Sequence, residues 1–270
     1  MLVRACVDAE LRRTYRFGHF GGPTILAVDW VAVLAIVAVT AIAGAVQALT
    51  GFGYALLSTP LLSAVIGPRD AVVMSVLYGM LAAVSMTLQF RATIDHPVMW
   101  RVCVGRLVGM PFGVVVLASL SRDALRLGIA VAVLSSTVLL WRGFRLHRAG
   151  GMIDIAAGVV SGALTTSVST GGPPLVLAMQ ARGMDPDTFR GTMSAVSLYT
   201  GAIAIGLIAA SGRLTPDALV ASVVGLPGLA AGMSVGRAFA HRVEPARFRE
   251  LVLTLLVVAA LIAAASVVWG

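Results

Sequence analysis

The stretch Ser169-Thr-Gly-Gly-Pro-Pro174 interrupts an uncharged run, residues 155–181, that is otherwise long enough to cross a lipid bilayer. Two glycines followed by two prolines end a regular helix, because proline has no N–H and its ring clashes with the preceding turn. In hydrocarbon, each backbone group freed at such a break is costly unless protein, water or a ligand satisfies it. The hydroxyl-bearing residues between 165 and 170 therefore indicate a binding site within a membrane protein.

The composition points to the same class of protein. The 270-residue chain is 59% hydrophobic and 12% charged, against about 45–50% and about 25% in soluble proteins. Such a chain has too little polar surface to face water as a soluble globule. Further uncharged runs lie at 30–68, 71–90, 191–212, 218–236 and 251–270. Each reaches about the 20 residues that span a bilayer core, so the sequence predicts an all-α polytopic membrane protein.

The charged and metal-binding residue types exclude several functions. All twenty basic residues are Arg, and the net charge is +8. With no soluble basic domain to hold a nucleic acid, the arginines are interpreted as flanking the membrane spans, and no nucleic-acid partner is predicted. The sequence contains no HExxH pair or carboxylate pair, and its two cysteines, Cys6 and Cys103, form no cluster. The chain is therefore predicted not to be an enzyme and to hold no metal or cofactor.

The chain divides into two halves that look like copies. Residues 1–27 are expected to be an N-terminal tail, 28–141 a first transmembrane repeat, 142–152 a polar linker and 153–270 a second transmembrane repeat. The expected apolar segments are 28–49, 51–66, 71–90, 102–120 and 124–141, then 153–169, 172–181, 190–210, 217–236 and 248–269.

Short matches, such as Met74-Ser75 with Met193-Ser194, recur close to 120 residues apart. An odd number of crossings in each half would place the second copy upside down, an arrangement that recurs in secondary transporters. We therefore expect an inverted repeat of 8–10 helical segments, with broken or re-entrant helices at the midplane.

A second break, in the first half, matches the break at Ser169–Pro174. It is Thr50-Gly-Phe-Gly53, with Gln47 one turn earlier. Helices that begin after such breaks point N–H groups and a positive dipole end at the midplane, which suits a small anion. The candidate substrate-binding residues are Gln47, Thr50, Gly51, Phe52, Gly53, Thr166, Ser169, Thr170, Gly171, Gly172, Pro173 and Pro174. The alternative is a pair of packing kinks whose hydroxyls bond back to their own helices.

Two further polar residues within apolar segments are kept as candidates. Gln180, near the end of its segment, could coordinate the substrate or face a loop. Arg106 could supply a counter-charge to an anion, but the favoured interpretation is a side chain that snorkels to the headgroups, about one turn beyond Arg101. Glycine ladders, at residues 105, 109 and 113 and at 228, 232 and 236, allow another helix to approach, within the fold or in a homodimer.

Five stretches resemble the TauE/SafE sulfite-exporter family of membrane permeases. They are Gly51-Phe-Gly53, Gly171-Gly-Pro-Pro-Leu-Val-Leu177, Arg190-Gly-Thr-Met-Ser194, Leu226–Gly236 and Arg247-Phe-Arg-Glu-Leu251, within residues 30–268. The resemblance implies a multi-pass secondary carrier of the bacterial inner membrane for a small anion such as sulfite, a sulfonate or a related organic anion. Tyr54 departs from a first motif that usually holds more glycines, which narrows that part of the site.

The mechanism expected of such a carrier is alternating access to a site between the two repeats. Three other classes remain as alternatives. A membrane accessory or assembly protein would move nothing across the bilayer. An intramembrane enzyme would need the His, acid or Cys clusters that the sequence lacks, and a channel would need a ring of like charges or a filter motif, neither of which is visible.

Overall fold

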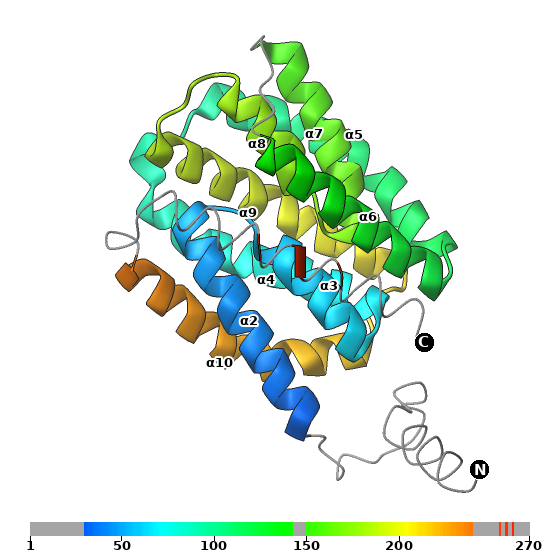
Figure 1. The fold of residues 1–270 in the computed structure, drawn as a ribbon. Coiled ribbons are helices and arrows are strands. Elements are labelled where there is room, and N and C mark those ends of the chain that lie inside the picture. Colours follow the sequence, from blue (N-terminus) through cyan, green and yellow to red (C-terminus); the bar gives the residue numbers. More distant parts are fainter. Residues whose placement is uncertain (1–29, 143–149, 240–253, 255–256, 259–260, 262–270) are drawn as a thin grey trace, which may run out of the picture. The chain divides into compact units, whose positions relative to one another are not determined.

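A computed structural model describes residues 30–142 and 150–239, with four further positions between 254 and 261 (Figure 1). Within these residues the secondary structure is helical and contains no strand, as predicted. The helices are α2 (Trp30–Thr50), α3 (Tyr54–Ile66), α4 (Pro68–Gln89), α5 (His96–Ser119), α6 (Arg122–Trp141), α7 (Gly151–Val168), α8 (Gly172–Gln180), α9 (Pro186–Ala210) and α10 (Pro216–Phe239), with a 3₁₀ turn η1 (Arg91–Thr93).

Six of these helices are long and apolar enough to cross a membrane, namely α2, α4, α5, α7, α9 and α10. Helix α3 has 13 residues and α8 has nine. Their lengths of about 20 Å and about 14 Å are shorter than a bilayer core of about 30 Å. The predicted segment 248–269 falls almost wholly outside the described residues, as do the tail 1–27 and most of the linker 142–152.

Both predicted helix breaks occur, and each contains a residue in the left-handed region of backbone conformation. After α2, Gly51 and Gly53 have φ angles of 83° and 98°, which glycine adopts without a steric penalty. After α7, Ser169 has a φ of 58°, where a side chain costs roughly 1–2 kcal/mol. The N–H of Thr170 donates to the carbonyl of Leu164 at 3.2 Å, so one of the last carbonyls of α7 is satisfied from beyond the helix end.

Two helices begin four or more residues earlier than the sequence predicted. Helix α5 begins six residues early, at His96, because the carboxylate of Asp95 accepts a hydrogen bond from an N–H of the first turn. Helix α9 begins four residues early, at Pro186, because Asp185 caps it in the same way. As a consequence, Arg106 is the eleventh of the 24 residues of α5 and lies near the middle of that helix.

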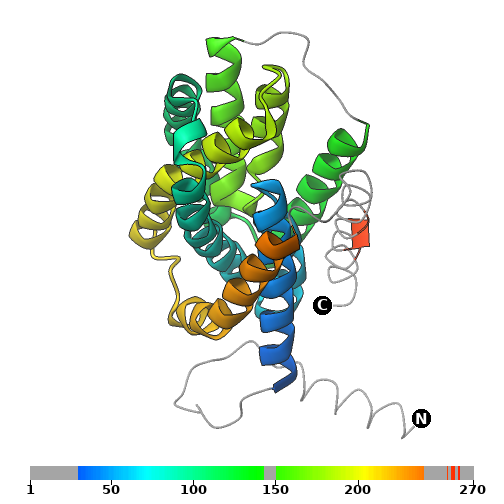
Figure 2. The same cartoon turned by 90° about the vertical axis from the view of Figure 1, so that its left-hand side faces the viewer.

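Glycines bring two pairs of helices into close contact. A Cβ added at Gly109 of α5 would lie 2.8 Å from the carbonyl carbon of Val159 on α7, and one added at Gly232 of α10 would lie 2.7 Å from that of Ala41 on α2. Small residues permit such backbone approach between membrane helices. We call these contacts the α5–α7 seam and the α2–α10 seam. Figure 2 shows α10, in orange, crossing α2, in blue. Both predicted glycine ladders therefore pack within the chain.

Candidate functional site

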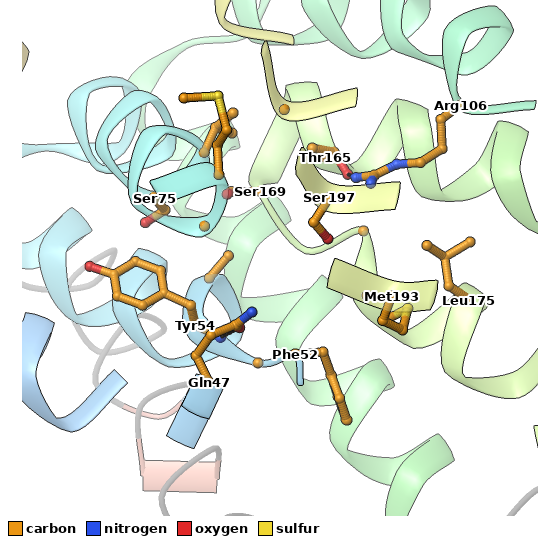
Figure 3. Close-up of a pocket in the computed structure, with 18 residues that line it drawn as sticks. Gln47, Phe52, Tyr54, Ser75, Arg106, Thr165, Ser169, Leu175, Met193 and Ser197 are labelled. Atoms are coloured by element: carbon orange, nitrogen blue, oxygen red, sulfur yellow. Dashed lines mark hydrogen bonds between the residues drawn. The ribbon is translucent and has the colours of Figure 1, made fainter. Parts of the chain in front are cut away.

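A cavity of about 90 Å³ lies where the two helix breaks meet. That is room for several water molecules or one small anion. Figure 3 shows Arg106 pointing toward Thr165 and Ser197, with Gln47 and Tyr54 on the other side of the cavity. Its polar side chains are those of Gln47, Ser75, Arg106, Thr165, Ser169 and Ser197. Its larger apolar and aromatic side chains are those of Phe52, Tyr54, Val76, Met80, Leu175 and Met193.

The side chain of Gln47 pairs with the backbone of the first break. Its Oε1 accepts from the N–H of Tyr54 at 3.1 Å, and its Nε2 donates to the carbonyl of Gly51 at 3.3 Å. Both backbone groups have lost their helical partners at the break. The amide is thereby fixed at the edge of the cavity. Ala55 also borders the cavity, and its N–H, in the first turn of α3, has no partner within its own helix.

At the second break, hydroxyl groups bond to the backbone, as the side chain of Gln47 does at the first. Ser161 Oγ donates to the carbonyl of Gly171 at 2.6 Å, and Thr165 Oγ1 donates to the carbonyl of Ser161 at 2.7 Å. The two prolines that follow Gly172 in α8 carry no N–H, so fewer donors need a partner there. Gly172 opens α8 beside the cavity, at the positive end of the helix dipole.

Arg106 enters the cavity from α5, and its side chain is almost completely buried, with 6% of the residue exposed. Its Nη1 donates to Thr200 Oγ1 at 2.7 Å, and its Nη2 donates to Thr165 Oγ1. Both hydroxyls give their own protons to carbonyls of their own helices, so their lone pairs are available to the guanidinium. Within the described residues, Nε has no partner and no carboxylate pairs with Arg106. The favoured snorkelling interpretation is therefore wrong, because the guanidinium turns inward between α7 and α9.

The closest carboxylate on α7 is engaged elsewhere. Asp154, 1% exposed, accepts from Arg101 Nε at 2.9 Å and from Arg182 Nη2 at 2.6 Å. It precedes Thr165 by eleven residues, about 16 Å along the helix axis. Among the described residues that line the cavity, Arg106 is consequently the one that carries a charge.

Half of the predicted site residues line the cavity, namely Gln47, Phe52, Gly53, Arg106, Ser169, Gly171 and Gly172. The others are outside its wall: Thr50, Gly51, Thr166, Thr170, Pro173, Pro174 and Gln180.

Of the four polar residues outside the wall, two bond to nearby backbone. Thr50 Oγ1 bonds the carbonyl of Val46 on its own helix at 2.8 Å. Thr166 Oγ1 donates to the carbonyl of Met110 across the α5–α7 seam at 2.7 Å. Thr170 is buried, but its hydroxyl has no partner within the described structure. Gln180 is exposed at the end of α8.

Helices α4 and α9 contribute wall residues that the sequence prediction missed. From α9 these are Met193, Ser197 and Gly201, spaced four residues apart along one helix face. From α4 they include Ser75 and Met80. The matched pairs Met74-Ser75 and Met193-Ser194 lie on these same two helices, one in each half. This match between the halves is the sequence signal that could have identified α4 and α9 as parts of the cavity wall.

Six helices long and apolar enough to cross a membrane, with a cavity between several of them that has polar side chains in its wall, define a multi-pass membrane protein. Residues 36–262 match the model of a protein family described as "Sulfite exporter TauE/SafE". The chain belongs to this family, whose members are membrane transporters of the sulfite-exporter type and not enzymes. A search of curated proteins and a search of solved structures each gave no match.

Proposed function

We propose that the chain is a secondary transporter that moves a small anion, such as sulfite, a sulfonate or a related organic anion, through the cavity between the two helix breaks. The observation that carries the proposal is Arg106, a buried guanidinium without a carboxylate partner in the described structure, turned toward a cavity of about 90 Å³. An anion in the cavity would supply the missing counter-charge.

The energetics favour a ligand over a purely structural role for Arg106. An Arg at the centre of a membrane helix costs about 2.5–3.5 kcal/mol on insertion scales. The neutral hydroxyls of Thr165 and Thr200 solvate the guanidinium but do not neutralise it. Because Arg106 is buried, its charge is screened far less than in water, and a bound anion is attracted more strongly. The N–H groups of Ala55 and Gly172 add donors from two helix N-termini.

The packing of the two halves supports an inverted repeat. The fourth segment of each half packs on the first segment of the other half, α5 on α7 and α10 on α2. The residues that face Gly109 and Gly232, Val159 and Ala41, lie 118 positions apart, because 159 − 41 = 118. The residues with positive φ at the two breaks lie at the same spacing, because 169 − 51 = 118.

Such a pair of related halves, with a site at their meeting point, is suited to alternating access by rocking of one half against the other. The two short helices α3 and α8 would then be the re-entrant elements whose N-terminal ends face the substrate. We further propose that the protein resides in a bacterial inner membrane and that lipid covers its apolar outer helices. A homodimer remains part of this proposal, although both glycine ladders are used within the chain.

The test is uptake of labelled sulfite into proteoliposomes containing the purified protein. Arg106→Gln keeps hydrogen-bonding capacity but removes the charge. We expect its uptake at sub-saturating sulfite to fall at least about tenfold, since a hydrogen bond to a charged group contributes about 1.5–3 kcal/mol. Arg122→Gln is the matched control, because Arg122 is exposed at the start of α6, and it should retain wild-type uptake.

Two results would count against the proposal. Full uptake by Arg106→Gln would remove this residue from the site. A wild-type protein that is well folded and orientated in the vesicles, yet moves neither sulfite nor small sulfonates, would favour the alternative of an accessory protein that transports nothing.

A further inference from the structure

The charge balance of the cavity is simple enough to limit what it can bind. Of its polar lining residues, Gln47, Ser75, Thr165, Ser169 and Ser197 are neutral at every physiological pH. No Asp, Glu, His or Lys lines the cavity within the described structure. The total side-chain charge of the wall is therefore the single positive charge of Arg106.

Titratable groups on the surrounding helices do not change this balance. Tyr54 lines the cavity with a phenol, and Cys103 is buried one turn before Arg106 on α5. Tyr78 of α4 donates its hydroxyl proton to the carbonyl of Ser222. Tyr199, the neighbour of Thr200 on α9, is half exposed. Phenols and buried thiols are neutral near pH 7, so none of these groups adds a charge.

The nearest charged groups on the packed helices are also engaged. On α9, Arg190 Nη1 lies 3.7 Å from Asp187 Oδ1, and Arg190 Nη2 donates to the carbonyl of Leu49 at 2.9 Å. On the α7 side, Asp154 is held by two arginines, as described above. None of these side chains lines the cavity.

The first and second halves differ at the position that supplies the charge. Arg106 follows the first glycine of the α5 ladder, Gly105, and the corresponding residue after Gly228 in the α10 ladder is Leu229. Leu229 is buried, and its side chain approaches Gly44 of α2. The α10 ladder of the second half therefore contributes no cation that matches Arg106. The two halves match in their helix breaks and glycine ladders, but only the first half supplies the charge at this position.

We propose that the cavity accepts anions with one negative charge and rejects dianions, so that hydrogensulfite, and not the sulfite dianion, is the form transported. This inference rests on the proposed function. One anionic charge neutralises Arg106. A second would be left without a partner beside a wall that includes Phe52, Leu175 and Met193, and burying an unpaired charge is strongly unfavourable.

The same wall explains how a proton could travel without a protein carboxylate. Because no acid lines the cavity in the described structure, the proton would cross on the substrate itself, bound to a sulfite oxygen. When hydrogensulfite moves inward and then releases its proton, the net result is the transport of one proton together with one sulfite dianion.

The experiment compares two competitors of similar shape and fixed charge. Methanesulfonate is a monoanion and sulfate a dianion near neutral pH, and the two differ only by a methyl group in place of one oxygen. Labelled sulfite uptake into proteoliposomes is measured against increasing amounts of each, at constant ionic strength. We expect methanesulfonate to inhibit at a concentration at least about tenfold lower than sulfate.

A second arm varies pH equally on both sides of the vesicle membrane. Sulfite titrates near neutrality, so the hydrogensulfite fraction rises as the pH falls, and uptake at constant total sulfite should rise with it after subtraction of protein-free vesicles. Uptake of labelled methanesulfonate, whose charge does not change, should stay level over the same range and so controls for effects of pH on the protein.

The outcomes separate the inference from the proposed function. If the protein transports sulfite but sulfate competes as well as methanesulfonate, or uptake rises with the dianion fraction, the charge selection is overturned and transport stands. If neither labelled anion is taken up by the wild-type protein, the proposed function fails, and the inference fails with it.

Discussion

The two adjacent glycines at the second break should differ sharply in what they tolerate. A Cβ at Gly171 would overlap Thr165 Oγ1 and would lie 2.5 Å from the carbonyl oxygen of Ser161. Ordinary carbon–oxygen contacts are about 3.3–3.6 Å, so both oxygens, the hydroxyl of Thr165 most of all, must move by roughly 1 Å. A Cβ at Gly172 would meet only Phe52 Cδ2, at 3.5 Å, which is an ordinary van der Waals distance.

The displaced group in Gly171→Ala is the hydroxyl that accepts from Arg106. Losing a hydrogen bond to a charged group costs about 1.5–3 kcal/mol, and the guanidinium would also lose its alignment with the cavity. We therefore expect the affinity for a bound anion to fall about ten- to a hundredfold. Gly172→Ala should stay within about threefold of the wild type, because no contact of Arg106 changes.

The measurement is anion binding by titration calorimetry on purified protein in detergent, followed by sulfite uptake into proteoliposomes. Size-exclusion profiles and thermal unfolding show whether each variant remains folded. Equal affinities for Gly171→Ala and the wild type would refute the reasoning, since the overlap would then be absorbed without moving Thr165. An equal loss in both alanine variants would instead indicate a general disturbance of the break.

Three further substitutions test the packing and the residues outside the cavity. Gly109→Ala should destabilise the protein by about 1–3 kcal/mol, because the added methyl group pushes the helices of the α5–α7 seam apart. The loss should appear as a lower unfolding temperature in detergent. The control is Gly206→Ala, which should leave that temperature unchanged because nothing lies within 4 Å of the added Cβ. Thr170→Val should leave anion affinity unaltered and stability equal or higher, because it replaces a buried hydroxyl that has no hydrogen-bond partner in the described structure; a tenfold weaker affinity by calorimetry would return Thr170 to the site. Asp154→Asn should lower stability by about 1.5–3 kcal/mol through lost charged hydrogen bonds at its buried carboxylate, and an unchanged denaturation midpoint would argue against that cluster.

The fold could be predicted largely from local chemistry. Uncharged runs of about 20 residues predict membrane helices because hydrocarbon excludes charge, and the glycine and proline clusters marked both breaks because they cannot continue a helix. The sequence placed the starts of α5 and α9 too late because the apolar runs of these helices are bounded by Arg101 and Arg190. The caps Asp95 and Asp185 lie several residues earlier.

The error at the start of α5 led directly to the error about Arg106. A helix beginning at residue 102 places Arg106 in its second turn, within reach of the headgroups. A helix beginning at His96 places the same residue near the middle, where its side chain must find partners inside the protein. Gln180 lies outside the cavity wall because it is eight positions beyond Gly172, at the far end of α8, about 12 Å along the helix axis.

The glycines of the α5–α7 seam, whose α5 ladder the sequence suggested only as a packing device, also influence the electrostatics of the site. Cβ atoms at Gly158 and Gly162 of α7 would lie 3.1 Å from the N and 2.8 Å from the Cα of Arg106, so the two backbones touch at the residue that carries the guanidinium. No side chain from α7 can stand between them and hold the helices apart. Arg106 is 6% exposed in this arrangement, and its burial strengthens its attraction for an anion because the surroundings screen it less than water would. The close helix packing and the position of the charge therefore depend on each other. Without the glycines, Arg106 would have room to turn outward, and the cavity would lose the group that distinguishes an anion from water.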